Sequence, residues 1–248
     1  MPRFFVKQEQ ISDNIVSVTG EDAHHIARSL RMAVGEGITV CDSVGNEYEC
    51  EIISFADDKE VRAEIKAVGR SAGEPRYHID LFQALPKGDK LDSIIQKAVE
   101  CGASEIYLFQ SERCVVRIKK ENEERKNERR QKIAESAAKQ CGRGMIPTVH
   151  EAVDFKDMLA LATKDDLCLF CYEGKGTRPI GQVLAERLGS SVKTISIIIG
   201  SEGGFSEKEA SEAEAAGMVP VGLGSRILRT ETASGFALAC ISCMTELC

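Results

Sequence analysis

The feature that most constrains the fold is the regular alternation of strand-like and helix-like segments after Tyr77. Short runs of aliphatic and β-branched residues predict strands, and apolar residues spaced three and four apart predict the helices between them. Strands and helices that alternate in this way form a parallel sheet covered by helices. We therefore expect an α/β domain over residues 76–248. The expected strands are 77–85, 105–109, 166–172, 194–200 and 218–224, and the expected helices are 89–102, about 122–141, 154–162, 180–189, 206–216 and about 230 onward.

Residues 1–70 show a different pattern, with little helix. The exception is "EDAHHIARSLRM" (21–32), which reads as a short helical stretch. Residues 37–55 read as two strands around a Gly-Asn turn, and residues 61–67 alternate apolar and charged side chains, as a strand does. We expect a small β-barrel or sandwich here, joined to the α/β domain by the Gly-, Ser- and Pro-containing stretch 69–76.

The composition is that of a globular protein with enough apolar residues to bury a hydrophobic core. It is 43% hydrophobic and 29% charged, and no apolar run approaches the roughly 20 residues that span a bilayer. The first residues contain no long apolar stretch, so we expect no signal peptide, no membrane partner and a cytoplasmic location.

Ten cysteines raise the question of a metal site. The pair Cys168 and Cys171 lies in a predicted strand, where residues three apart face opposite sides. The pair Cys240 and Cys243 lies in a small-residue apolar run that reads as a helix. Free cysteine is a common core residue in reducing compartments, so we expect no metal.

Charge is unevenly distributed along the chain. The net charge is −7, yet residues 111–145 hold 11 Lys and Arg against 6 Glu. Such segregation suggests a surface for an anionic partner such as RNA. A solvated helix with internal Glu–Arg pairs explains the same charges equally well.

Three glycine-containing loops follow predicted strands, at 172–179, 200–206 and 222–233. In open parallel sheets, ligands bind beyond the carboxyl ends of the strands, where glycines let the backbone approach closely. The familiar nucleotide motifs are not present. "GKGT" lacks the glycine spacing of a phosphate loop, and no G-x-G-x-x-G opens the first βαβ unit.

Two of these loops, read together, carry a specific signature. "IGSEGGFS" (199–206) and "LGSRILRTET" (223–232) resemble the G-P-E-G-G-[LF]-[ST] and L-G-x-R-[IV]-L-R-T-E-T segments of SPOUT methyltransferases. The chain looks most like the family that methylates N3 of a uridine in small-subunit ribosomal RNA. Further matches are "HHIARSLRM", "IQKAVECG", "SERCVV" and "AAKQCGRGMIP". Ser201 stands where the family has proline, and because proline presets φ we expect a looser loop and weaker cofactor binding.

The resemblance implies a fold, a cofactor and partners. It implies a PUA-like β-barrel (1–70), a C-terminal parallel-sheet domain (76–248) tied in a deep trefoil knot, and a homodimer. It also implies S-adenosyl-L-methionine as methyl donor and 16S ribosomal RNA in the 30S subunit as substrate. A 2′-O-ribose or transfer-RNA methyltransferase of the same superfamily, or a non-catalytic RNA-binding ribosome-assembly module, stays open as an alternative.

The same resemblance suggests which residues bind the cofactor and which act on the substrate. Packing of Ile227 and Leu228 in the core before the last helix fits the sequence as well as adenine contacts do. Arg229 is expected to steady the uracil or its phosphate, because a planar guanidinium reaches two oxygens at once. Glu202 or Glu231 is expected to accept the N3 proton or to orient Arg229, although an acid at Glu231 is also favoured simply by a helix start. The expected cofactor contacts are Tyr172, Glu173, Ile199, Gly200, Gly203, Leu223, Gly224, Ile227, Leu228 and Thr232, and the expected RNA contacts are Arg3, Arg28, Arg31, Arg113, Arg117, Arg129 and Arg143.

Overall fold

The computed structural model describes residues 1–57, 59–118 and 123–247. The chain divides into two compact units. Unit 1 consists of residues 1–74 and 138–146, and unit 2 consists of residues 75–137 and 147–248. The sequence alone places the boundary between residues 70 and 76, which remains a prediction, and it contains no signal for the return of 138–146 to the first unit.

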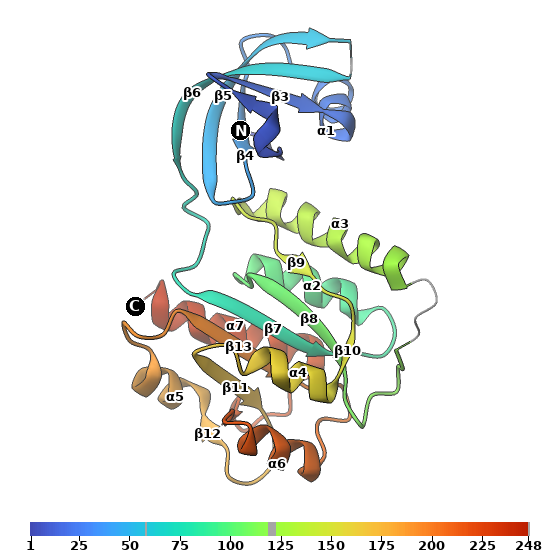
Figure 1. Cartoon of the computed structure of the whole chain (residues 1–248), viewed down its shortest axis with the longest axis vertical. Coiled ribbons are helices and arrows are strands. Elements are labelled where there is room, and N and C mark those ends of the chain that lie inside the picture. Colours follow the sequence, from blue (N-terminus) through green and yellow to red (C-terminus); the bar gives the residue numbers. More distant parts are fainter. Residues whose placement is uncertain (58, 119–122, 248) are drawn as a thin grey trace. The chain divides into compact units, whose positions relative to one another are not determined.

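Unit 1 is built on a β-sheet with its own hydrophobic core (Figure 1). The strands follow the order β1-β4-β5-β6-β3-β2, in which β1 and β4 are parallel and the other neighbours are antiparallel. Alternation places Val61, Ala63 and Ile65 of β6 inside. The elements are β1 (Arg3–Phe5), η1 (Gln8–Gln10), β2 (Ile11–Ser12), β3 (Ile15–Thr19), α1 (Gly20–His24), the π-helical turn η2 (His25–Ser29), β4 (Gly37–Cys41), β5 (Asn46–Ala56) and β6 (Glu60–Arg70).

Unit 2 contains the predicted parallel sheet (Figure 1). Its strands run in the order β10-β8-β7-β13-β11-β14-β12, with β9 beside β8, and each of these neighbouring pairs is parallel. The strands are β7 (His78–Ala84), β8 (Glu105–Gln110), β9 (Thr148–Val149), β10 (Val153–Asp154), β11 (Leu167–Cys171), β12 (Arg178–Pro179), β13 (Thr194–Ile199) and β14 (Val219–Gly222).

Helices cover this sheet. α7 packs on β13 with α2 and α5 beside it, α4 packs on β7 and β8, and α6 packs beside β14. The α/β architecture with a parallel sheet confirms the expectation from sequence. The helices are α2 (Lys90–Glu100), α3 (Glu123–Cys141), α4 (Phe155–Ala162), α5 (Ile180–Arg187), α6 (Glu207–Ala215) and α7 (Thr230–Thr245).

The expected elements are found within a few residues of their predicted bounds. The expected start of the long helix at Asn122 lies outside the described residues. The short strands β9, β10 and β12 are missed by the sequence pattern, because two residues cannot display a period. Among the helices of the described chain, none is long and apolar enough to cross a membrane.

Candidate active site

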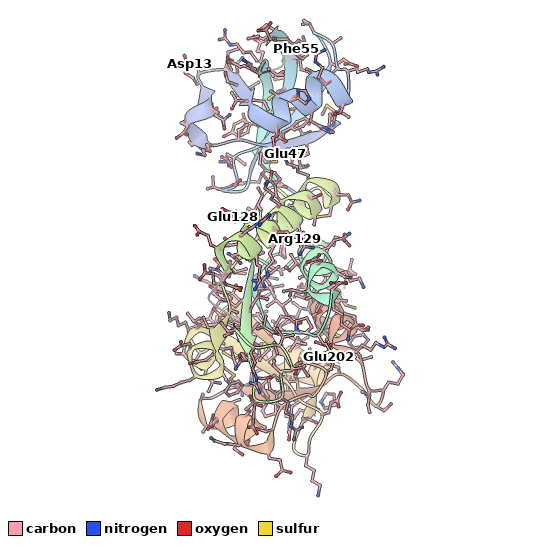
Figure 2. All side chains as sticks on the ribbon, turned by 90° about the vertical axis from the view of Figure 1, so that its right-hand side faces the viewer. Asp13, Glu47, Phe55, Glu128, Arg129 and Glu202 are labelled. Carbon is pink, nitrogen blue, oxygen red and sulfur yellow. The ribbon has the colours of Figure 1, made fainter. Side chains whose placement is uncertain are left out.

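Three loops at the carboxyl ends of neighbouring strands enclose one cavity of about 1000 Å³ in unit 2. They follow β13, β11 and β14, which are adjacent in the sheet. Parallel strands direct these ends to the same edge, so segments far apart in the sequence meet there. Glu202, on the loop after β13, is labelled in Figure 2.

The loop after β13 changes direction sharply within a few residues. Ile199 is buried in the sheet, and Gly204 adopts a φ of 62°, a conformation that favours glycine. The N–H of Gly204 donates to the carbonyl of Ser201 at 2.9 Å. Ser206 then caps α6 in a reciprocal box, because its hydroxyl accepts from the Glu209 N–H and its own N–H donates to the Glu209 carboxylate.

Gly203 is required for a different reason. A Cβ at this position would lie 2.9 Å from Arg113 Cβ and 3.2 Å from the Arg113 carbonyl oxygen. The guanidinium of Arg113 donates to the Gly203 carbonyl at 3.2 Å, and Arg113 lines the cavity. The segment after β8 is held in place by Glu112, whose N–H donates to the Glu209 carboxylate.

A buried relay ties the start of α7 to the same loop. The side-chain amide of Gln83, at the end of β7, donates to the Thr230 hydroxyl at 3.0 Å, and that hydroxyl donates to the Gly200 carbonyl at 2.7 Å. Gln83 and Thr230 are both buried. No sequence signal marked Gln83, because a glutamine in an apolar strand shows its role only through a partner 147 residues away.

Alternating charges run from the cavity lining to the start of α7. The Nζ of Lys90 lies 2.7 Å from Glu202 Oε1 and 3.6 Å from Glu231 Oε2, and Arg229 lies 4.0 Å from the other oxygen of Glu231. Burial alone would raise the pKa of Glu202, but hydrogen bonds from Lys90 and from the N–H of Lys87 outweigh it and lower the pKa below its usual range. Glu202 is therefore ionised at neutral pH.

The residues proposed for the cofactor lie together with one exception. Thr232 is exposed on α7 and is not among the residues around the cavity. Ile227 is 86% exposed, so its interpretation as core filling is wrong. The lining includes Tyr172, Glu173, Ile199, Gly200, Gly203, Leu223, Gly224, Ile227 and Leu228.

The three proposed catalytic residues occupy different positions. Glu202 and Arg229 line the cavity, whereas Glu231 lies in the first turn of α7 and does not line it. Arg229 is the residue before α7, and its side chain is 82% exposed. Lys90, which no motif marked, lines the cavity beside them.

The arginines proposed for RNA contact divide by their environment. Arg3 pairs with Glu47 at 2.7 Å, Arg129 of α3 (labelled in Figure 2) pairs with Asp92, and Arg143 is 3% exposed and bonded to Glu74. Those three guanidiniums are engaged within their own units.

The remaining arginines lie at the surface or at the cavity. Arg113 and Arg117 are exposed, and Arg113 belongs to the cavity rim. Arg28 lies in the π-helical turn η2, one residue before its end. The spacing of three residues would place Arg28 and Arg31 on one face of the helical stretch predicted over 21–32. Arg31 lies beyond the turn with a φ of 52°, so this expectation is wrong. Arg31 has left the helix before it could align with Arg28.

The cysteines do not form a metal centre in the part of the chain that the structure describes. The Sγ of Cys168 donates to the Ala162 carbonyl, while Cys171 lines the cavity. Burial raises the pKa of the Cys168 thiol to about 11 and that of Cys171 to about 12. Both thiols are protonated at neutral pH, and a thiol binds metal as the thiolate.

Comparison with known families and proteins gives a consistent result. Residues 73–242 match the model of an RNA methyltransferase domain, and residues 18–66 match an RNA methyltransferase PUA domain. The "Ribosomal RNA small subunit methyltransferase E" of Bacillus subtilis is 36% identical over 252 residues, which cover 100% of this chain and 98% of that protein.

Solved structures with similar folds include two that contain a bound ligand. One is a ribosomal RNA small subunit methyltransferase E from Neisseria gonorrhoeae bound to S-adenosyl methionine, with a TM-score of 0.84, 28% identity, and coverage of 99% of this chain and 98% of that one. The other is a putative methyltransferase from Legionella pneumophila in complex with the same cofactor, with a TM-score of 0.82, 29% identity, and coverage of 98% and 97%.

Proposed function

The chain belongs to the family of RNA methyltransferases that join a PUA domain to a methyltransferase domain, and we propose from this premise that it methylates N3 of a uridine in 16S ribosomal RNA. Its enzyme class is S-adenosylmethionine-dependent methylation of small-subunit ribosomal RNA, which rests on the family match and on 36% identity along the whole chain. The choice of uracil N3 is supported by the paired segments "IGSEGGFS" and "LGSRILRTET".

The cavity fits S-adenosyl-L-methionine in size and lining. Small-molecule sites typically occupy roughly 300–1,000 Å³ and combine apolar walls with a few polar groups, and the cavity measures about 1000 Å³. Ile199, Leu223 and Leu228 offer apolar surface for adenine, while Gly200 and Gly224 present backbone. When bound, the cofactor supplies an electrophilic methyl group on a sulfonium.

The protein's own residues would orient the uracil and manage its proton. The exposed guanidinium of Arg229 can donate two hydrogen bonds to oxygens of the base or its phosphate. Ionised Glu202 can receive the proton that leaves N3. The observation that carries the proposal is the convergence of Arg229, Glu202 and the glycine loops on one cavity.

RNA binding by unit 1 is part of the proposal. Residues 18–66 match a PUA domain found in RNA methyltransferases. Arg28, Arg31, Arg113 and Arg117 are proposed to contact phosphates. Arg3, Arg129 and Arg143 are paired with acids, so their contact with phosphate requires those ion pairs to open.

We also propose a homodimer, a trefoil knot in unit 2 and a cytoplasmic location. These follow from the resemblance to the SPOUT superfamily and from the ribosomal substrate. Light scattering at micromolar concentration tests the dimer, and a monomer there would count against it.

One experiment tests the reaction. The protein is incubated with labelled S-adenosylmethionine and unmethylated 30S subunits, and the modified nucleoside is identified by mass spectrometry. We expect 3-methyluridine. A 2′-O-methylated nucleoside, or transfer to transfer RNA alone, would support the other methyltransferase alternative. RNA binding without methyl transfer or cofactor binding would indicate a ribosome-assembly module.

A further inference from the structure

Lys90 lies in the site without an assigned role. It is the first residue of α2, its side chain is 31% exposed, and it lines the cavity. Neither the glycine loop nor the segment before α7 contains it. A lysine at a helix start is not favoured by the helix dipole, so helix stability does not explain its presence.

The ammonium group of Lys90 lies between two carboxylates from different elements. Its Nζ is 2.7 Å from Glu202 Oε1 and 3.6 Å from Glu231 Oε2. Glu202 comes from the loop after β13 and Glu231 from the first turn of α7. Two carboxylates this close would repel each other without a cation between them, and one would become protonated more readily.

Glu202 keeps room to accept a proton. Its Oε1 accepts from Lys90 at 2.7 Å and from the Lys87 N–H at 3.1 Å, whereas its Oε2 lies farther from that same N–H, at 3.3 Å. A carboxylate has about four lone-pair sites on its two oxygens. Glu202 also lines the cavity with its side chain 35% exposed, while Glu231 is 20% exposed and does not line it.

We propose that Lys90 is a positioning residue for methyl transfer, which holds Glu202 in place and ionised so that Glu202 Oε2 receives the proton from N3. Glu231 is the second anchor for the ammonium and orients Arg229. This inference rests on the proposed uridine N3 methylation.

The proton transfer balances within these groups. The N3–H bond of the uracil breaks, an O–H bond forms at Glu202 Oε2, and the electron pair that stays on N3 would form the new bond to the methyl carbon. The carbon–sulfur bond of the donor would break in exchange, with its electron pair kept by sulfur in the neutral thioether that leaves. Glu202 then releases the proton to water, which restores the ion pair with Lys90.

Charged groups from several segments contact Glu202 or its direct neighbours. Lys90 of α2 and the N–H of Lys87 before that helix contact Glu202 itself, Glu231 shares the Lys90 ammonium and lies near Arg229, and Arg113 after β8 contacts Gly203. Loss of Lys90 removes the nearest cation and leaves Glu231 in place. The apparent pKa that governs the acid side of the methylation pH profile should therefore rise.

The test compares Lys90→Met with Lys90→Arg. Methionine keeps an apolar stem of similar length, and arginine keeps the charge. Lys97→Met, on the exposed surface of the same helix, is the matched control. Single-turnover methylation of 30S subunits is measured against pH at saturating S-adenosylmethionine. We expect the acid limb of Lys90→Met to move up by about one pH unit, with about tenfold slower transfer below it.

Three further measurements separate positioning from structural support. Calorimetry should give cofactor affinities within about twofold of the unsubstituted protein, since Lys90 acts on the proton acceptor. Lys90→Arg should restore the profile, and Lys97→Met should not change it. In a Glu202→Gln background, Lys90→Met should cause little further loss, because residues that act as a unit are not additive.

A titration without substrate distinguishes failure of this inference from failure of the proposed function. Protein labelled with ¹³C at the glutamate carboxyls is titrated by NMR, and the Glu202 signal is identified by its loss in Glu202→Gln. We expect its pKa to rise in Lys90→Met. If the unsubstituted protein makes 3-methyluridine but the Glu202 signal and the pH profile are unchanged in Lys90→Met, the role of Lys90 is refuted. If it makes no 3-methyluridine, the proposed function fails, and the catalytic role of Lys90 with it.

Discussion

Gly203 and Arg113 lie so close together that a β-carbon on Gly203 would be 2.9 Å from the Cβ of Arg113. Arg113 comes from the segment after β8 and Gly203 from the loop after β13, and the Arg113 guanidinium also donates to the Gly203 carbonyl. The backbone of the loop after β13 is thus fitted against a second segment of unit 2.

Gly203→Val is therefore expected to weaken binding of S-adenosylmethionine by about tenfold or more, because the loop must move away from Arg113. Gly181→Ala, on the exposed face of α5 with open space around it, is the control and should bind normally. Calorimetry on folded protein measures both. Unchanged affinity in Gly203→Val would show that the loop does not line the cofactor site.

Thr230→Val should destabilise the protein by about 1–3 kcal/mol, since it leaves the Gln83 amide and the Gly200 carbonyl without their buried partner. Thr245→Val removes a hydroxyl bonded to a carbonyl of the same helix and should cost less than about 0.5 kcal/mol. Urea unfolding measures the difference between the two variants. Equal losses of unfolding free energy in the two variants would mean that the buried relay does not contribute to stability.

Arg229→Lys should slow methyl transfer by about 100-fold and leave cofactor affinity nearly unchanged, because lysine keeps the charge but loses the planar fork. The fold should be unaffected, since the Arg229 side chain is 82% exposed. Arg226→Lys, on the same loop and also exposed, provides the comparison. Single-turnover rates and calorimetry separate the two effects, and equal losses in both would mean that Arg229 acts in cofactor binding and not on the uracil.

His78 should make stability depend on pH. Its Nε2 lies 2.9 Å from Asp80 Oδ1, and this contact raises the pKa of the imidazole above its usual value despite partial burial. A raised pKa means that the stabilisation is complete below the unfolded pKa and is lost as pH rises through the folded pKa. His78→Gln should therefore lower the urea midpoint at pH 5.5 and have less effect at pH 8.5. A larger effect of His78→Gln at pH 8.5 than at pH 5.5 would contradict the raised pKa of the imidazole. Asp80→Asn should make the effect of His78→Gln the same at the two pH values.

Reversal of charge at Arg28 and Arg31 should reduce methylation of 30S subunits without affecting cofactor binding. Each change puts repulsion where attraction to phosphate is expected, so apparent RNA affinity should fall at least about tenfold at low salt. Lys59→Glu with Arg62→Glu makes the same charge change elsewhere in unit 1. Filter binding at two salt concentrations measures the RNA affinity. Equal losses in both double variants would mean that RNA affinity depends only on the net charge of unit 1.

This full-length substitution is a cleaner test than deletion of residues before Glu74. Unit 1 includes residues 138–146, and Arg143 within them is 3% exposed and bonded to Glu74. A shortened chain would leave segment 138–146 without the rest of unit 1, so loss of activity would not isolate RNA binding.

Much of the fold and the location of the site could be predicted from the sequence. Ile197–Ile199 followed by glycines indicates a buried strand and a tight loop, and the alternation after Tyr77 places such loops at one edge of a parallel sheet. The spacing of apolar residues reflects which side chains are buried within each element, and turn residues mark where the element ends. The strand and helix positions predicted from these local signals therefore agree with the structure.

The contacts of Lys90, Gln83 and Arg143 were decided only by the tertiary structure. Lys90 meets Glu202 across 112 residues, and Gln83 meets Thr230 across 147. The sequence predicts Arg143 as an RNA contact, whereas the structure pairs its guanidinium with Glu74. A side chain's partner depends on strand order, register and loop closure together, and no local pattern of apolar and polar residues encodes a contact between distant segments.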